Sequence, residues 1–186
     1  MPLTIGIAVG SLRRESFNRR LAEALTQHPA AKGNTFAFLE IGTLPLYNQD
    51  DDANPVEAVK NLKQQVRAAD AVIFVTPEYN RSVPGVLKNA IDHASRPYGD
   101  GAWAGKPAAV IGTSPGAIGT ATAQQHLRNI LVAVGMPTLP LPEACIQWKD
   151  DLIGPDGQIA GKTAEFVGKW LESFLAFARL HNAERI

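Results

Sequence analysis

The groups best suited to chemistry are the polar side chains of residues 10–18, GSLRRESFN. This segment follows an apolar run and leads into a helical pattern, so it lies at a predicted helix N-terminus. Free backbone N–H groups and the positive end of the helix dipole attract anions at such a place. The side chains that could contribute to an anion site are Ser11, Arg13, Ser16 and Asn18. The pattern favours a phosphate site, because an arginine can grip a phosphate through two parallel hydrogen bonds. In the alternative reading, Ser16 is only an N-cap and the arginines form a solvated face.

Two standard phosphate-binding loops are missing from the sequence. It contains no GxxxxGK[ST] motif, which disfavours a nucleoside triphosphatase. No GxGxxG motif follows the first apolar run, and residues 116–119 (GAIG) supply only half of that pattern. The phosphate is therefore expected to be the monoester of a mononucleotide.

Two further loops follow apolar runs and carry stiff or glycine-rich turns. Residues 76–82 (TPEYNRS) offer backbone amides and the aromatic face of Tyr79, which could meet a planar heterocycle. Residues 113–120 (TSPGAIGT) allow close approach of a ligand to the backbone. Each loop could equally be a structured turn or a helix cap.

The remaining reactive residue types do not form a recognisable catalytic or metal site. Cys145 has no histidine close in sequence and is expected to be a buried small hydrophobe. The four histidines are isolated, and residues 50–52 (DDD) lack the glycine and distal glutamate of a calcium loop. The three tryptophans are expected to pack. No catalytic side chain and no metal are therefore predicted.

Five apolar runs predict five strands, each followed by a helical pattern. The expected strands are residues 3–9, 35–41, 71–75, 108–113 and 136–141. The second helix is expected to begin at Asn54, with Pro55 in its first turn and Glu57 closing a capping box. Pro84 is expected in the first turn of the third helix, and the last helix should cover about residues 163–180. Alternating apolar strands and helices predict an α/β fold, a doubly wound five-stranded parallel sheet with helices on both faces. A ligand should lie at the carboxyl ends of the strands, where the three loops meet.

Composition limits the function classes. The 186 residues (19.9 kDa) are expected to form a single domain over residues 1–186. Eighteen basic residues balance eighteen acidic ones, which gives no general attraction to nucleic acid or anionic membranes. With no apolar run near membrane-spanning length and no basic leader, a cytoplasmic location is expected.

Three long segments resemble one known family. They are residues 10–18, residues 77–96 (PEYNRSVPGVLKNAIDHASR) and residues 116–131 (GAIGTATAQQHLRNIL). They are similar to the NADPH-dependent FMN reductase family, and most similar to its quinone and chromate reductase branch. The resemblance extends from Ile5 to the last helix. It implies a flavodoxin-like fold with sheet order 2-1-3-4-5, FMN as cofactor, NADPH or NADH as co-substrate, and a homodimer or homotetramer.

The resemblance also implies roles for individual residues. The FMN phosphate would be held by Ser11, Arg13, Ser16 and Asn18. The isoalloxazine would be lined by Pro77, Glu78, Tyr79 and Asn80, and its pyrimidine side would be approached by Ser114 and Gly116. Arg128 and Glu143 would belong to the subunit interface.

The activity that the resemblance implies is two-electron transfer from NADPH or NADH to quinones by a ping-pong hydride mechanism, with azo, nitro or chromate compounds as further acceptors. In such an enzyme the flavin carries the chemistry, which agrees with the absence of a predicted catalytic side chain. One alternative is a flavodoxin-type electron carrier without its own NAD(P)H chemistry, although the zero net charge and the basic first loop argue against an acidic carrier. A flavin-free binding protein on the same fold is a second alternative.

Overall fold

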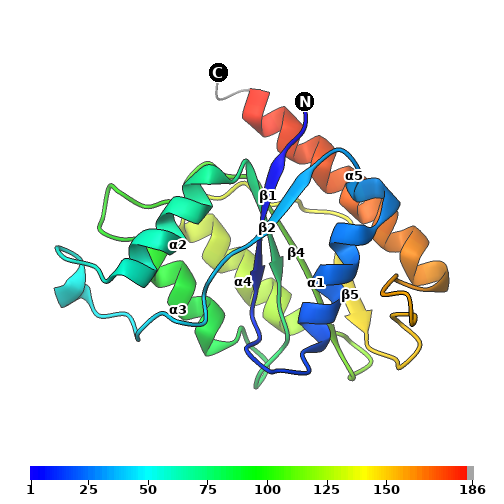
Figure 1. Ribbon diagram of the computed structural model, residues 1–186. Coiled ribbons are helices and arrows are strands. Elements are labelled where there is room, and N and C mark those ends of the chain that lie inside the picture. The colour runs from blue at the N-terminus through cyan, green and yellow to red at the C-terminus, as the bar shows by residue number, and fades with distance from the viewer. Residues whose placement is uncertain (184–186) are drawn as a thin grey trace.

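The computed structural model describes residues 1–183 and contains a five-stranded parallel sheet in the order β2-β1-β3-β4-β5 (Figure 1). The strands are β1 (Thr4–Val9), β2 (Thr35–Phe38), β3 (Ala71–Val75), β4 (Ala108–Ser114) and β5 (Ala144–Gln147). The flavodoxin-like order that the resemblance implied is therefore confirmed. β3 is the central strand and β1 lies beside it, and both are almost entirely buried, as their continuous apolar runs predict.

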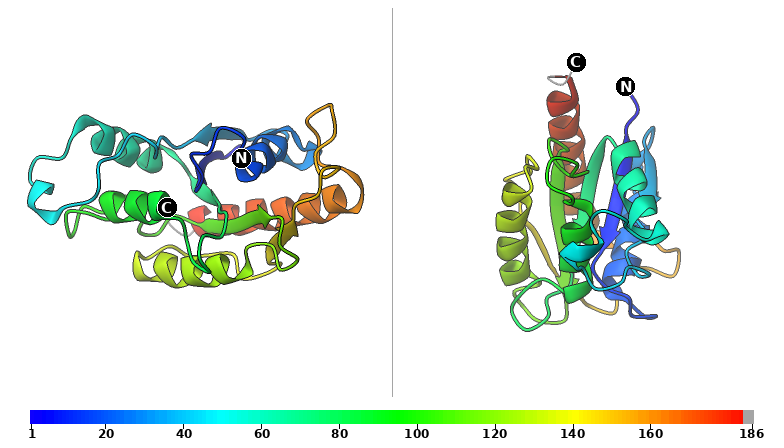
Figure 2. Two further views of the ribbon diagram at one scale, coloured as in Figure 1. Left: turned by 90° about the horizontal axis from the view of Figure 1, so that it is seen from below. Right: turned by 90° about the vertical axis from the view of Figure 1, so that its left-hand side faces the viewer.

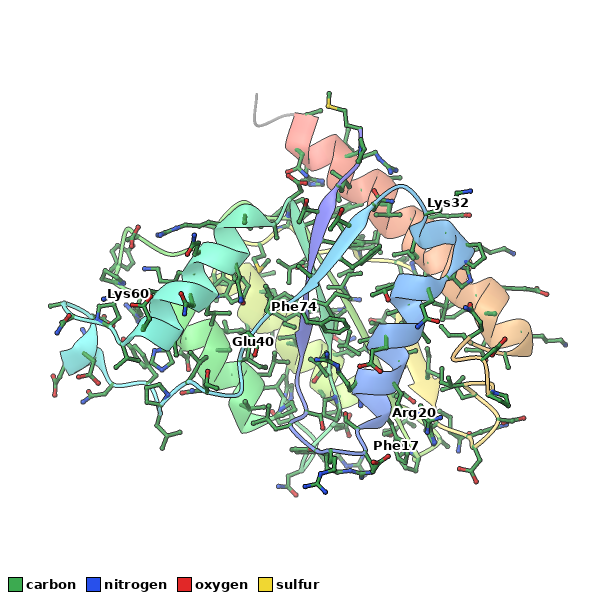
Figure 3. The ribbon with its side chains drawn as sticks, in the orientation of Figure 1. Phe17, Arg20, Lys32, Glu40, Lys60 and Phe74 are labelled. Atoms are coloured by element: carbon green, nitrogen blue, oxygen red, sulfur yellow. The ribbon has the colours of Figure 1, made fainter. Side chains whose placement is uncertain are left out.

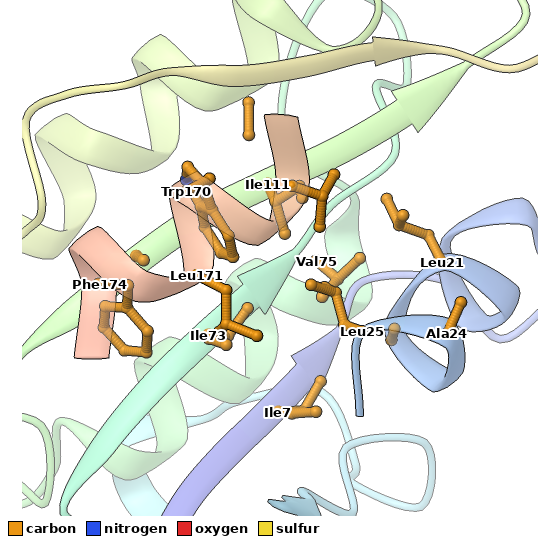
Figure 4. Close-up of a cluster of buried hydrophobic side chains, with 14 of the residues drawn as sticks. Ile7, Leu21, Ala24, Leu25, Ile73, Val75, Ile111, Trp170, Leu171 and Phe174 are labelled. Carbon is orange, nitrogen blue, oxygen red and sulfur yellow. The ribbon is translucent and has the colours of Figure 1, made fainter. Parts of the chain in front are cut away.

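Five α-helices cover both faces of the sheet (Figure 2). They are α1 (Phe17–Gln27), α2 (Glu57–Ala68), α3 (Gly85–Ala94), α4 (Ala121–Ala133) and α5 (Gly161–Ala183). One apolar cluster joins α1 and α5 to the first face of the sheet, with Leu21, Ile73 and Trp170 at its centre (Figure 4). A second cluster joins α2, α3 and α4 to the opposite face around Phe74 and Trp103. None of these helices, in the part of the chain described, is both long and apolar enough to cross a membrane.

The fifth strand differs from the prediction. Residues 136–141 form only one isolated bridge, between Thr138 and Ala108, and the strand itself is β5, a few residues later. Pro137 and Pro140 interrupt the earlier segment, because proline has no backbone N–H to donate to a ladder. The second strand is also shorter than expected, since it ends at Phe38.

Two predicted helix starts are also wrong in detail. The N-cap of α2 is Val56, with no side-chain cap, and the predicted capping box is not formed. Asn54 instead donates its N–H to the carbonyl of Asp51 and so closes a turn that directly follows the 3₁₀ helix Gln49–Asp51. Pro84 is the N-cap of α3 and does not lie within its first turn.

All five strands run in the same direction, so their carboxyl ends share one edge of the sheet, the lower edge in Figure 1. The loops after β1, β3 and β4 meet there. Gly112 allows the end of β4 to lie close to the start of the loop after β3, because a Cβ at position 112 would lie 2.1 Å from the carbonyl oxygen of Thr76. The fold thus brings together the three loops that the sequence singled out.

Candidate functional site

The three loops enclose a cavity of about 140 Å³ at the carboxyl edge of the sheet. Its lining comprises Ser11, Arg13, Ser16, Phe17, Asn18, Pro77, Glu78, Tyr79, Thr113, Ser114 and Pro115. The structure therefore brings together all the predicted site residues except Asn80 and Gly116, which are exposed neighbours of the lining. Phe17, Thr113 and Pro115 were not among the predicted residues.

The start of α1 forms one end of the cavity and supplies hydrogen-bond donors that suit an anion. Ser16 is buried, and its hydroxyl accepts a hydrogen bond from the N–H of Arg19 at 3.1 Å, so it is an N-cap. The N–H groups of Phe17 and Asn18 precede the first intrahelical bond, which leaves them free for a ligand. The hydroxyl hydrogen of Ser16 is also free to donate, because the cap uses only an oxygen lone pair. Capping and anion binding are therefore compatible at this position.

Asn18 has a structural contact that its sequence position did not reveal. Its buried side-chain amide donates to the carbonyl of Thr113 at 2.8 Å and accepts from the N–H of Thr113 at 3.0 Å. The ladder between β3 and β4 has ended by this point, since its last residue pair joins Val75 and Ile111. Asn18 thus substitutes for a neighbouring strand and fixes the first loop to the end of β4. One amide hydrogen of Asn18 remains for a ligand.

Thr113 supplies a further polar group at the floor of the cavity. Its hydroxyl is buried and has no hydrogen-bond partner among the described residues. An unsatisfied buried hydroxyl is unfavourable, so this atom suits a ligand with hydroxyl or phosphate oxygens. The one feature of the sequence that pointed to Thr113 was its position at the end of an apolar run. Ser114 is in the same position, so the sequence did not single out Thr113.

Glu78 connects the second loop to α4. Its carboxylate accepts a hydrogen bond from the N–H of Ala123, in the first turn of α4, at 3.0 Å. The negative charge therefore lies at the positive end of that helix, where it is stabilised by the dipole. Glu78 lines the cavity and also fixes the relative position of the second and third loops.

A tight turn follows Glu78 and presents Tyr79 at the rim. Tyr79 and Ser82 exchange two backbone hydrogen bonds at 3.1 and 3.0 Å. The two residues between them, Asn80 and Arg81, both have positive φ angles (51° and 65°), an unfavourable conformation for arginine. The Ser82 hydroxyl lies 3.0 Å from Nδ1 of His126 on α4, which anchors the turn. Such strain is typical of functional sites, and here it shapes the mouth of the cavity.

The arginines of the first loop and α1 lie against aromatic rings. The Arg13 guanidinium carbon is 5.1 Å from the centre of the Phe17 ring, and Arg13 also donates to the carbonyl of Glu15. Arg19 lies over Phe38 and pairs with Glu23, and Arg20 lies over Trp148. Arg13, Arg19 and Arg20 therefore do not form a freely solvated basic face, because each guanidinium is held by a cation–π contact.

The site contains no arrangement for acid–base, nucleophilic or metal chemistry. No group of histidines, cysteines and carboxylates within residues 1–183 could hold a metal ion. Cys145 lies on β5, outside the cavity lining, and is half-buried rather than fully buried as expected. Burial, with a smaller effect from Glu143, raises the pKa of its thiol, which makes it a poor nucleophile at neutral pH. What the site offers is a row of hydrogen-bond donors and an aromatic rim.

Three larger hollows lie elsewhere on the surface. One of about 520 Å³ lies beside β5 and the start of α5, one of about 370 Å³ lies between α2 and the segment after β2, and one of about 580 Å³ lies near the carboxyl ends of α3 and α4. None of them includes any residue of the three loops. The smaller cavity is therefore the better candidate, because it alone combines converging donors with the carboxyl edge of the sheet.

Comparisons with known proteins identify the family. A family model described as NADPH-dependent FMN reductase matches residues 3–149. A quinone reductase from Pseudomonas putida is 46% identical over 181 residues, which cover 97% of each chain. A 2-hydroxy-1,4-benzoquinone reductase from a Burkholderia species is 47% identical over 180 residues, or 96% of this chain and 98% of that one.

A solved structure agrees with these relatives. FerB from Paracoccus denitrificans, described as a flavoenzyme NAD(P)H:(acceptor) oxidoreductase, superimposes with a TM-score of 0.92 at 47% identity, covering 96% of this chain and 98% of its own. Fold, sequence match and nearly full-length relatives lead to one conclusion: the chain belongs to the NADPH-dependent FMN reductase family of oxidoreductases.

Proposed function

We propose that this protein is an FMN-dependent NAD(P)H:quinone reductase that works by a ping-pong mechanism. The observation that carries the proposal is the cavity itself, in which an open helix N-terminus, an arginine and an orphaned hydroxyl converge at the carboxyl edge of a flavodoxin-like sheet. These donors fit a phosphate and the polyol chain attached to it. The relatives named for quinone reduction support the acceptor class.

Each end of the cavity has a separate role in the proposal. The phosphate would be held at the start of α1 by Ser11, Arg13, Ser16 and Asn18, with Thr113 at the floor. The isoalloxazine would lie against the second loop, lined by Pro77, Glu78, Tyr79 and Asn80. Its pyrimidine side would face Ser114 and Gly116.

The chain's own residues bind and orient, and FMN, when bound, supplies the hydride chemistry. NADPH or NADH and the quinone would occupy the same place at the rim in turn, which requires a ping-pong order. Backbone N–H groups of the second and third loops would stabilise negative charge that develops near them during transfer. Azo, nitro and chromate compounds are proposed as further acceptors, and the cytoplasm, which supplies reduced nicotinamides, as the location.

The proposal includes a homodimer or homotetramer that uses the outer face of α4. Val132 on this face and Leu141 just beyond it are each 71% exposed. Arg128 donates to the carbonyl of Leu139 at 2.6 Å, but its Nε is buried without a hydrogen bond and stays 3.8 Å from Glu143. A second copy would cover these exposed apolar groups. Light scattering coupled to size exclusion tests this: a mass of two or four chains is expected, and a monomer would contradict it.

The activity is tested by titrating the FMN-loaded protein with NADPH in the absence of oxygen and following the flavin absorption band. Bleaching by one equivalent is expected. A bound flavin that neither NADPH nor NADH bleaches would favour an electron carrier, and a protein that binds no FMN would overturn the cofactor site.

The order of substrates needs a steady-state experiment. Rates measured over a grid of NADPH and quinone concentrations should give parallel lines in a double-reciprocal plot. Intersecting lines would rule out the ping-pong order while leaving the reductase activity intact.

A further inference from the structure

A stack of two aromatic rings and two guanidinium groups runs beside the cavity. The rings of Phe17 and Trp148 are nearly parallel, 17° apart, with their centres 4.3 Å apart. Arg13 lies over Phe17 at 5.1 Å, and Arg20 lies over Trp148 at 4.9 Å. Figure 3 shows Phe17 and Arg20 at the same end of α1, at the lower edge of the sheet. Since Trp148 covers one face of the Phe17 ring, Arg13 lies against the other.

Trp148 and Arg13, on the two sides of the Phe17 ring, differ in burial and in their contacts. Trp148 is only 6% exposed, and its backbone N–H donates to the carbonyl of Ser114 at 2.8 Å, so it is fixed at the end of β5. Arg13 is exposed, and its guanidinium hydrogen-bonds only within its own loop, to Glu15. Among the described residues, the stacking on Phe17 is the one hydrogen bond, ion pair or ring contact that ties the Arg13 side chain to the body of the protein beyond its own loop.

We propose that Trp148 is a positioning residue for the phosphate end of the site, which holds Arg13 in place through Phe17 and thereby sets the preference for a phosphorylated flavin over riboflavin. The inference rests on the proposed function, because it assigns Arg13 to the FMN phosphate. A free arginine loses much side-chain freedom when it binds an anion. A guanidinium already stacked on a fixed aromatic pair loses less, so the phosphate is bound more tightly.

The experiment measures the dissociation constants of FMN and of riboflavin for the same protein and takes their ratio. Riboflavin lacks the phosphate, so damage that is merely structural weakens both ligands and leaves the ratio unchanged. Trp148→Leu removes the aromatic face and keeps apolar volume, and Trp148→Phe keeps an aromatic face. We expect Trp148→Leu to reduce the preference for FMN about three- to fivefold, the size of an exposed cation–π contact. Trp148→Phe should retain most of the preference.

A double-mutant cycle with Arg13→Ala tests whether Trp148 changes the preference for FMN by acting through Arg13. In the Arg13→Ala background, Trp148→Leu should no longer change the ratio. An unchanged ratio in Trp148→Leu alone, or an equal loss with and without Arg13, would overturn the inference. Trp148 also belongs to the apolar cluster beneath α1 and α5, and if Trp148→Leu fails to fold, Phe17→Leu takes its place in the same cycle with the same outcomes. Failure of the wild-type protein to bind FMN would instead refute the proposed function.

Discussion

Replacement of Asn18 by alanine should destabilise the protein even when no flavin is present. The Asn18 amide makes two hydrogen bonds to the backbone of Thr113, at 2.8 and 3.0 Å, and both partners are buried. Alanine would leave the N–H and the carbonyl of Thr113 without partners. Each stranded backbone group costs about 1–3 kcal/mol, and water entering from the cavity would recover part of it, so we expect a total loss of about 2–4 kcal/mol.

The assay is denaturant unfolding of the flavin-free protein, supported by thermal unfolding. For a chain of this size the expected loss lowers the melting temperature by roughly 5–15 °C. Ser11→Ala is the matched control, because Ser11 lines the same cavity and its hydroxyl accepts only one long hydrogen bond, 3.4 Å, from the N–H of Arg13. It should change stability by no more than about 0.5 kcal/mol.

The outcome separates two roles of Asn18. If Asn18→Ala leaves the flavin-free protein as stable as the wild type while FMN affinity falls, Asn18 is only a ligand group. Asn18 would then not act as a substitute for a missing strand neighbour of Thr113.

Three further predictions concern ligand affinity at Arg13, the acid sensitivity set by Asp100 and the packing around Gly112. Arg13→Ala should weaken FMN binding by about 2 kcal/mol, roughly thirtyfold, and leave riboflavin binding unchanged, which flavin fluorescence titration measures. The Asp100 pKa is lowered by its hydrogen bond from Lys63, so the carboxylate stabilises the fold above the ordinary carboxyl range, and this contribution is lost as pH falls through the lowered pKa. Asp100→Asn should therefore make the melting temperature less sensitive to acid below about pH 4. Gly112→Ala should destabilise by about 1–3 kcal/mol or more in denaturant unfolding, since its Cβ would lie 2.1 Å from a backbone oxygen, whereas Gly116→Ala, with no atom closer than 3.5 Å, should be neutral.

Sequence patterns correctly predicted the strands and helices that are marked by an uninterrupted run of apolar residues or by a regular helical spacing. β3 has the predicted bounds, residues 71–75, because five consecutive apolar residues between turn signals admit one interpretation. The fifth strand was misplaced because residues 136–141 are apolar but interrupted by proline, whereas β5 is a short half-exposed edge strand with a weak pattern. The start of α2 was wrong because Asn54 could satisfy either a cap or the preceding turn, and only the backbone decides between them.

The candidate site was predicted as a set of loops but not as a set of contacts. The three loops were found because parallel strands end at one edge, a rule that needs only the order of elements. The roles of individual residues in the second and third loops came from the family resemblance. The bond from Asn18 to Thr113 joins residues 95 positions apart, and the stack of Phe17 on Trp148 joins a helix to a distant loop. Such pairings depend on the tertiary arrangement, so no local pattern in the sequence indicates them. The orphaned hydroxyl of Thr113 could be recognised only once its surroundings were known.

The carboxylate of Glu78 at the start of α4 has a consequence for the direction in which a ligand can lie. The N-termini of α1 and α4 both lie on the carboxyl side of the sheet, next to the loops that line the cavity, and each would attract an anion if it were open. Glu78 closes the one at α4, whereas the one at α1 carries only the neutral cap of Ser16. A molecule charged at one end only therefore meets an attractive pole at α1 and a neutralised pole at α4. This edge of the sheet is therefore electrostatically asymmetric, and the Glu78 carboxylate disfavours binding of such a molecule in the reversed orientation.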